Sequence, residues 1–204
     1  MSGAEAYLPA QRDLGHLRRA AAECRGCDLW ENATQTVFGE GPADADIVLV
    51  GEQPGDQEDQ QGHPFVGPAG RLLDRGLESA GIDASSVYTT NVVKHFKWER
   101  RGGRRIHKTP SRWEVAACQP WFAAELAALT PKVVVLLGAT AAQAVFGRDF
   151  RVTRERGRVR PGPNGVDMVA TVHPSAVLRA PDERRAHEME EFVSDLRSAA
   201  VLLG

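Results

Sequence analysis

The sequence predicts an α/β protein, a three-layer α/β/α sandwich with a central parallel four-stranded sheet. Four short segments rich in β-branched residues alternate with segments that carry helical patterning. This alternation is typical of a parallel sheet covered by helices. The apolar runs at 47–50 and 133–137 are continuous rather than alternating, as expected for strands that are buried on both faces.

The predicted strands lie at 46–51, 87–93, 132–138 and 166–172. The connecting segments 52–69, 94–110 and 154–165 follow neither the strand nor the helix pattern, and we expect them to be irregular.

The first predicted helix begins after Asp13, whose side chain suits an N-cap, and runs to about Cys24. Ser111 and Glu114 have the spacing of a capping box. Pro120 is expected to kink or split the helix that follows them, because proline lacks a backbone N–H. The remaining helices are predicted at 70–80, 111–129, 139–146 and 182–203.

Length and composition favour one compact domain over residues 1–204, with 42% hydrophobic residues to form its core. The sequence has no run of about 18 apolar residues that would cross a bilayer and no secretory signal. We therefore expect a cytoplasmic protein with no membrane partner, and a monomer because no partner-binding helix is evident. Three cysteines are too few for a disulfide framework.

Positive charge is concentrated in one segment, although the formal net charge is −2. Between Lys94 and Lys108, seven lysines and arginines accompany a single acid, Glu99. A local cationic patch of this kind attracts phosphates. The segment therefore predicts a contact with nucleic acid.

Polar residues follow the ends of three predicted strands. Glu52 follows the first strand, Asn91 lies in the second, and His173 follows the fourth. The carboxyl ends of parallel strands share one edge, where ligands bind, so we expect these side chains to meet. Residues 138–140, after the third strand, have the composition of an ordinary turn.

Cys24 and Cys27 are separated by two residues, a spacing that lets two thiolates bind one metal centre. Cys118 and His95 are candidates for the two further ligands. A set of three cysteines and one histidine suits zinc, and thiolates also suit an iron–sulphur cluster. The residue types alone leave both possibilities open.

Two stretches of the chain resemble the iron–sulphur uracil-DNA glycosylases, the family 4-like branch of the uracil-DNA glycosylase superfamily. Residues 51–58 and 64–70 are similar to the first signature of this family, and His-Pro-Ser at 173–175 is similar to the second. The resemblance implies a uracil-DNA glycosylase-like fold, uracil-containing DNA as the substrate and a 4Fe-4S cluster. The ligands that it implies for this cluster are Cys24, Cys27, His95 and Cys118.

Three departures from the common pattern resemble the UdgX branch, whose members become covalently joined to uracil-containing DNA. Gln53 replaces a small residue, and His95 replaces a cysteine. An inserted basic loop at about 97–110 ends in Arg104-Arg105-Ile106-His107.

The resemblance implies that Phe65 and Asn91 recognise the base. An enzyme of this kind acts on single-stranded DNA or flips its nucleotide out of a duplex, and we expect it to prefer single strands. Phe65 corresponds to the ring that lies against uracil. The Asn91 amide offers one acceptor and one donor group, which complement uracil N3–H and O4.

Breaking the glycosidic bond leaves negative charge on uracil O2 and positive charge on the sugar. The resemblance implies that His173 donates a hydrogen bond to O2 and that Glu52 lies near the sugar. Gln53 and Asp56 are expected to hold the shape and hydrogen bonds of the pocket.

His107 decides the predicted product. A neutral imidazole is a competent nucleophile, and in the UdgX-like interpretation it attacks the sugar carbon after uracil leaves. If water attacks instead, the protein is an ordinary turnover glycosylase. A non-catalytic zinc protein that binds DNA is the third possibility. The side chains expected to contact DNA are Arg104, Arg105, Lys108 and Ser175.

Overall fold

A computed structural model describes residues 3–204 of the chain. Within these residues the main sheet has five strands in the order β2-β1-β5-β7-β6. Its first four strands run parallel, and β6 pairs antiparallel with β7. The strands are β1 (Ile47–Gly51), β2 (Val87–Asn91), β5 (Val133–Leu137), β6 (Val159–Pro161) and β7 (Asp167–Thr171).

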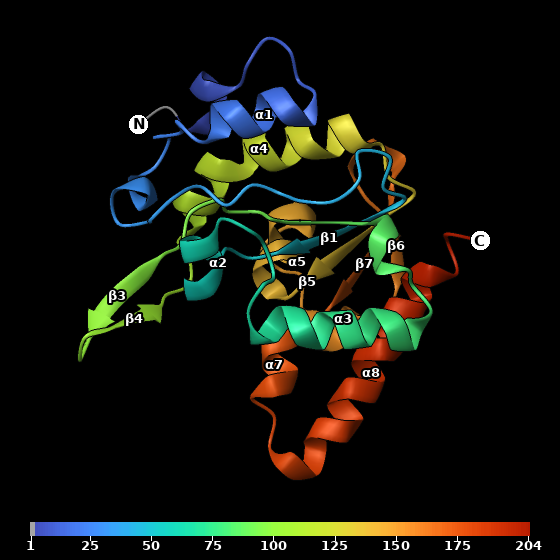
Figure 1. Cartoon of the computed structure of the whole chain (residues 1–204). Coiled ribbons are helices and arrows are strands. Elements are labelled where there is room, and N and C mark those ends of the chain that lie inside the picture. Colours follow the sequence, from blue (N-terminus) through green and yellow to red (C-terminus); the bar gives the residue numbers. More distant parts are fainter. Residues whose placement is uncertain (1–2) are drawn as a thin grey trace.

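Helices cover both faces of this sheet (Figure 1). Every residue of β1 and β5 is buried, and alternate side chains belong to two separate apolar clusters. The predicted three-layer sandwich is therefore confirmed. One face carries α1 (Leu14–Ala21), α4 (Arg112–Leu129) and α5 (Ala139–Phe146), and the other carries α3 (Pro68–Ala80), α7 (Pro174–Leu178) and α8 (Asp182–Ala200).

Two segments that we expected to be irregular contain strands. The antiparallel strand β6 lies in the segment 154–165, so the sheet has one strand more than predicted. The segment 94–110 contains a hairpin of β3 (Trp98–Arg101) and β4 (Arg104–His107). Gly102 and Gly103 connect these strands with φ values of 53° and 79°, and two adjacent residues at positive φ form the tight turn that suits a twisted hairpin.

The predicted helix starts at Asp13 and Ser111 are confirmed. The Asp13 carboxylate accepts the backbone N–H of His16 at 3.0 Å, and Ser111 and Glu114 form both hydrogen bonds of a capping box. Of the two effects expected of Pro120, a split of the helix does not occur, because α4 continues to Leu129. A kink at Pro120 stays a prediction.

The remaining elements are short. None of the described helices is both long and apolar enough to span a membrane. The short helices are α2 (Asp56–Gln61) and α6 (Val152–Glu155), and the 3₁₀ turns are η1 (Ala4–Tyr7), η2 (Asp28–Glu31), η3 (Ala84–Ser86) and η4 (Pro163–Gly165).

Candidate active site

A cavity of about 910 Å³ opens at the carboxyl edge of the parallel strands. Polar residues were expected to converge at this edge, and the size of the cavity is typical of a ligand pocket. The hairpin and α7 contribute residues to different parts of the wall. The predicted site residues that line it are Glu52, Gln53, Asp56, Phe65, Asn91, His107, His173 and Ser175.

Gly51 allows two of these side chains to approach the end of β1. A Cβ atom at Gly51 would lie 2.3 Å from Asn91 Oδ1 and 2.8 Å from Phe65 Cζ, so only a hydrogen fits there. Asn91 pairs with Gly51 in the parallel register. Within residues 3–204 the side-chain amide of Asn91 has no hydrogen-bond partner, which leaves its donor and acceptor free for a ligand.

The loop that carries Phe65 has a constrained backbone. Phe65 has a φ of 57°, a left-handed conformation that is uncommon for a residue with a bulky side chain. Gly70 packs against it so closely that a Cβ would lie 1.5 Å from the Phe65 carbonyl oxygen. The buried Glu58 carboxylate accepts the Gly67 N–H at 2.8 Å. These contacts hold the Phe65 ring nearly parallel to the His173 ring, with centroids 6.2 Å apart.

His173 is the N-cap of α7 and is held as a neutral ring. The Ser175 backbone N–H donates to His173 Nδ1 at 3.2 Å, so Nδ1 carries no proton and the neutral ring is protonated at Nε2. Burial is the largest cause that lowers the pKa of His173 to about 4, and its neighbours Arg179 and His107 make smaller contributions in the same direction. His173 therefore offers an Nε2–H donor at neutral pH.

Glu52 lies between His107 and the start of α5. Its Oε1 is 3.4 Å from His107 Nε2, and its Oε2 accepts a hydrogen bond from Thr140 Oγ1. The His107 side chain is 49% exposed and lies beside Phe96, with ring centroids 6.0 Å apart. The hairpin thus brings an accessible imidazole to the carboxylate at the end of β1.

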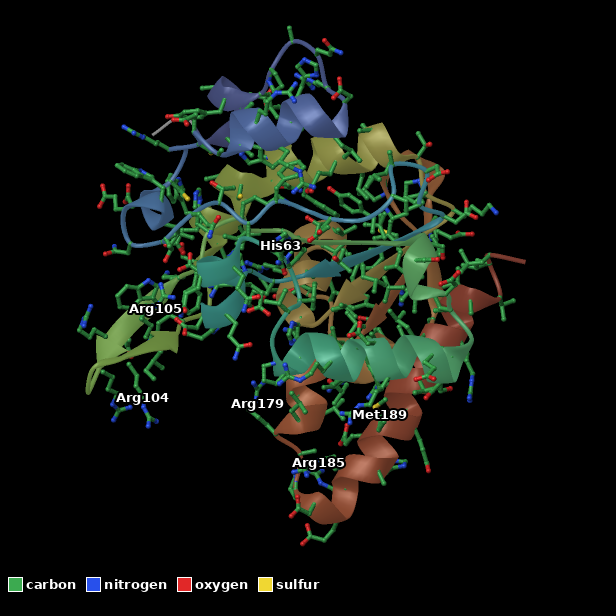
Figure 2. The ribbon with its side chains drawn as sticks, in the orientation of Figure 1. His63, Arg104, Arg105, Arg179, Arg185 and Met189 are labelled. Carbon is green, nitrogen blue, oxygen red and sulfur yellow. The ribbon has the colours of Figure 1, made fainter. Side chains whose placement is uncertain are left out.

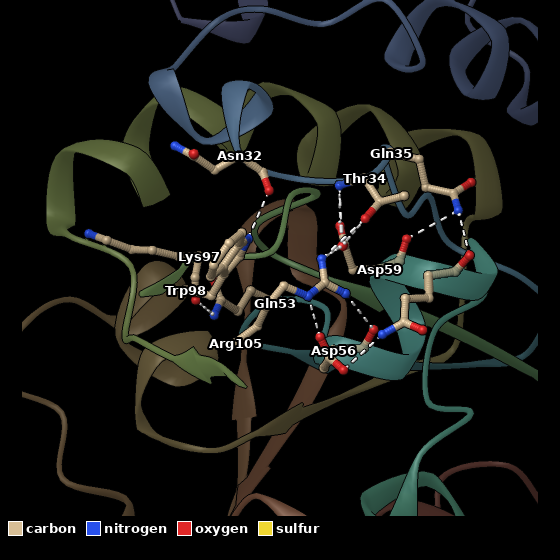
Figure 3. A network of polar contacts seen from close by, with 10 residues as sticks. Asn32, Thr34, Gln35, Gln53, Asp56, Asp59, Lys97, Trp98 and Arg105 are labelled. Atoms are coloured by element: carbon tan, nitrogen blue, oxygen red, sulfur yellow. Dashed lines mark hydrogen bonds and ion pairs between the residues drawn. The ribbon is translucent and has the colours of Figure 1, made fainter. Parts of the chain in front are cut away.

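Gln53 holds the base of the hairpin. Its Oε1 accepts the Lys97 N–H at 3.0 Å, and its Nε2 donates to the carbonyl oxygens of Lys97 at 3.2 Å and Lys108 at 3.1 Å. Figure 3 shows the contact of Gln53 with Lys97. Because Lys97 precedes β3 and Lys108 follows β4, this one amide joins the two ends of the hairpin and helps to fix the position of His107. Gln53 was expected to hold the shape of the pocket, and its hydrogen bonds in the structure are to the base of the hairpin.

Arg105 ties the hairpin to the sheet domain through carboxylates (Figure 3). Its Nε lies 2.5 Å from Asp56 Oδ1, and its Nη1 lies 2.6 Å from Asp59 Oδ2. Asp59 is fully buried and also accepts the Thr34 N–H at 2.9 Å. Asp56 and Arg105, expected to bind substrate and DNA, contact each other here, and a phosphate contact by Arg105 stays a prediction.

Residues 38–197 match the sequence model of the uracil DNA glycosylase superfamily. This chain belongs to that superfamily. Three relatives are each named a type-4 uracil-DNA glycosylase. The protein from Thermotoga maritima is 40% identical over 84% of both chains, and that from Archaeoglobus fulgidus is 38% identical over 94% of both. The protein from Sulfurisphaera tokodaii is 33% identical over 92% of this chain and 85% of its own.

The three cysteines of this superfamily member are buried free thiols. The indole N–H of Trp121 donates to Cys24 Sγ at 3.2 Å, and the Lys94 N–H donates to Cys118 Sγ at 3.3 Å. Such hydrogen bonds to sulphur are common around iron–sulphur clusters. Burial raises the pKa of the Cys118 thiol to about 12, and binding of a metal would replace its proton.

His95 lies near the cysteines as a neutral ring. Burial lowers its pKa to about 4, and a cavity of about 150 Å³ is lined by both His95 and Cys24. Within residues 3–204, no three His, Cys, Asp or Glu side chains gather closely enough to bind a single metal ion. Zinc and an iron–sulphur cluster both stay predictions for this donor set.

The predicted cationic patch is smaller than its sequence suggests. Lys94 is buried in an ion pair with Glu125, and Lys97 pairs with Glu114 at 2.7 Å. The expectation that Lys94 belongs to a surface patch is therefore wrong, because its partner comes from a distant part of the chain. The cations that remain exposed on the hairpin or just after it are Arg100, Arg101, Arg104 and Lys108.

The four residues expected to contact DNA lie in different settings. Arg104 and Arg105 point to opposite sides of the hairpin, with Arg104 facing away from α2 (Figure 2). Lys108 lies 3.3 Å from Glu99, and both side chains are about half exposed. Ser175 is directed to His173, since its Oγ lies 2.8 Å from Nδ1.

Sequence reasoning gave no role to three residues that matter for this geometry. Glu58 stabilises the Phe65 loop, and Thr140 contacts Glu52. Arg179, which directly follows α7, also lines the cavity. The position of Thr140 after a parallel strand was the available signal, because every such strand end borders the same edge.

Proposed function

We propose that this protein excises uracil from DNA and then becomes covalently joined to the resulting deoxyribose through His107. The observation that carries the proposal is the 3.4 Å separation of His107 Nε2 and Glu52 Oε1 in the cavity that Asn91 and His173 also line. The names of the type-4 relatives support the first step. The hairpin supports the second.

Recognition of uracil is assigned to Asn91 and Phe65. The free amide of Asn91 accepts from uracil N3–H and donates to O4, and cytosine presents the opposite pattern. The Phe65 ring stacks on the base and replaces the stacking lost on extrusion, which costs roughly a few kcal/mol in a duplex. Single-stranded DNA avoids most of this cost and is therefore the preferred substrate.

Cleavage breaks the bond between C1′ of deoxyribose and N1 of uracil, and the bonding electrons leave with the base. The Nε2–H of neutral His173 donates to uracil O2, where negative charge develops. The carboxylate of Glu52 stabilises the positive charge that develops at C1′. Uracil leaves as an anion and takes a proton from water.

Capture forms a bond between C1′ and the ring nitrogen of His107 that carries no proton. The imidazolium formed in this way releases its remaining N–H proton to Glu52 or to water. Uracil has gained one proton and the histidine has lost one, so the reaction balances without water as a reactant. Gln53 supports this step by holding both ends of the hairpin in place.

We also propose that this protein carries a 4Fe-4S cluster. When bound, the cluster supplies iron–thiolate and iron–imidazole bonds that join the segment after α1, the segment after β2 and α4. The buried thiols and their N–H donors support this assignment. Cys24→Ala should lose iron and inorganic sulphide, whereas His95→Cys should retain both. The proposed ligands are Cys24, Cys27, His95 and Cys118.

The test of capture is incubation with a single-stranded uracil oligonucleotide, followed by boiling in detergent and denaturing electrophoresis. The wild-type protein should give a band at the combined mass, and a thymine oligonucleotide should give none. His107→Ser should lose this band and leave abasic DNA that alkali cleaves, because water then attacks C1′. Abasic DNA without a combined band from the wild-type protein would identify an ordinary turnover glycosylase.

A further inference from the structure

Thr140 stands at the start of α5, where the chain leaves the third parallel strand of the site. Gly138 has a φ of 96°, and a Cβ there would lie 3.0 Å from His173 Cβ, so the glycine lets α5 begin directly against His173. The Gly138 N–H donates to the Thr171 carbonyl at 2.8 Å. Main-chain contacts therefore fix the first turn of α5 to the same edge that carries His173.

The two oxygens of Glu52 have different partners. Oε2 accepts the hydroxyl of Thr140, and Oε1 faces His107 Nε2 at 3.4 Å. A glutamate side chain has three rotatable bonds, and holding it in one rotamer carries an entropic cost. The Thr140 hydroxyl offsets that cost and fixes which oxygen faces the histidine.

We propose that Thr140 is a positioning residue that orients the Glu52 carboxylate toward both the sugar carbon and the His107 ring. The inference rests on the proposed function and extends it to a residue that contacts no reacting atom. Its effect passes entirely through Glu52. Loss of the hydroxyl therefore slows the chemical step and leaves the binding of uracil-containing DNA almost unchanged.

Thr140→Val removes the hydroxyl at nearly constant volume, and Thr140→Ser keeps it. With protein in excess over DNA, we expect Thr140→Val to form the adduct about 10- to 100-fold more slowly, the range for one hydrogen bond to a charged group. Thr140→Ser should restore the rate to within about 3-fold of the wild type, because its hydroxyl reaches the same oxygen. Thr140→Ala, which suits a helix, replaces the valine variant if the latter fails to fold.

The affinity for an oligonucleotide with uncleavable 2′-fluoro-2′-deoxyuridine separates positioning from a general structural role. It should stay within about 3-fold in all three variants, since Asn91 and Phe65 are untouched. An affinity loss as large as the rate loss would overturn the proposal. Failure of serine to restore the rate would do the same.

A double-mutant cycle with Glu52→Gln tests whether Thr140 acts through Glu52. In the Glu52→Gln background, Thr140→Val should cause little further loss, because the carboxylate that it orients is already absent. Multiplicative losses would contradict the inference. Free uracil is measured in the same reactions, so if the wild type releases uracil without adduct, capture by His107 fails and the cycle is still decided by the release rate.

Discussion

The two walls of the cavity are held in place by different kinds of contact. Glu52, Asn91 and His173 lie at or just after the ends of parallel strands, where main-chain hydrogen bonds set their spacing. His107 stands on a two-stranded hairpin outside the main sheet. The groups proposed for uracil removal are therefore positioned by the main chain of the sheet, whereas the proposed nucleophile is positioned by side-chain contacts of the hairpin.

The attachment of the hairpin depends on few side chains. Gln53 closes its base through three hydrogen bonds, and Arg105 ties it to two carboxylates, one from Asp56 and one from Asp59. Loss of these contacts should therefore move His107 without disturbing the strand ends.

The largest effect should come from breaking the buried ion pair between Lys94 and Glu125. Glu125 is 0% exposed and accepts from Lys94, Tyr88 and Thr90. Glu125→Ala leaves the Lys94 ammonium buried without its partner, which should lower the free energy of unfolding by about 3–5 kcal/mol. Chemical denaturation measures this loss. Glu99→Ala, which breaks the exposed pair of the hairpin, is the matched control and should cost less than about 1 kcal/mol.

Asn91→Ala should reduce uracil excision by about 10²- to 10³-fold, because it removes both polar contacts to the base, each worth about 1.5–2 kcal/mol. The preference for uracil over cytosine should disappear with it. Single-turnover release of each base measures both effects, and unchanged melting of the variant shows that the fold is intact. If the preference survives, another residue reads the base.

Gln53→Ala should affect the hairpin and leave the strand ends almost unchanged. We expect the rate of adduct formation to fall about 10- to 100-fold, because His107 is displaced from the geometry needed for attack. Release of uracil should change by less than about 3-fold, since the strand ends are untouched. Gln119→Ala, which removes an exposed glutamine of α4, should alter neither rate. Equal loss of both rates in Gln53→Ala would mean that the hairpin and the strand ends act as one unit.

The smallest effect concerns the outward face of the hairpin. Arg104→Ala should weaken the binding of DNA uniformly across sequences and reduce the salt dependence of binding by about one ion. Arg105→Ala should instead loosen the hairpin, because its guanidinium is engaged by Asp56 and Asp59. Titrations at several salt concentrations distinguish the two arginines. An equal change of salt dependence in both would contradict the internal role of Arg105.

The sequence predicted well which residues gather at the strand ends, because a parallel sheet fixes where those ends lie. Once the strands at 46–51, 87–93 and 166–172 are recognised, their carboxyl ends must meet at one edge, and Glu52, Asn91 and His173 come together there. The apolar patterns of these strands can be recognised from the local sequence alone.

The hairpin that carries His107 was predicted less well, because its geometry depends on residues that are distant in the sequence. The segment 94–110 lacks apolar alternation, and only its two adjacent glycines signal a hairpin. Lys94 and Arg105 looked like surface cations because Glu125 and Asp59, which pair with them, lie 31 and 46 residues away. Thr140 was dismissed as a turn residue, since no local pattern shows which carboxylate a hydroxyl will contact.

The most direct test of the account is to locate the DNA on the protein. The adduct formed with a short single-stranded uracil oligonucleotide is digested with nuclease and protease, and the modified peptide is sequenced by tandem mass spectrometry. We expect a deoxyribose on the His107 imidazole, with one uracil released for each protein modified. A deoxyribose on Lys108, or uracil released in large excess over modified protein, would contradict it.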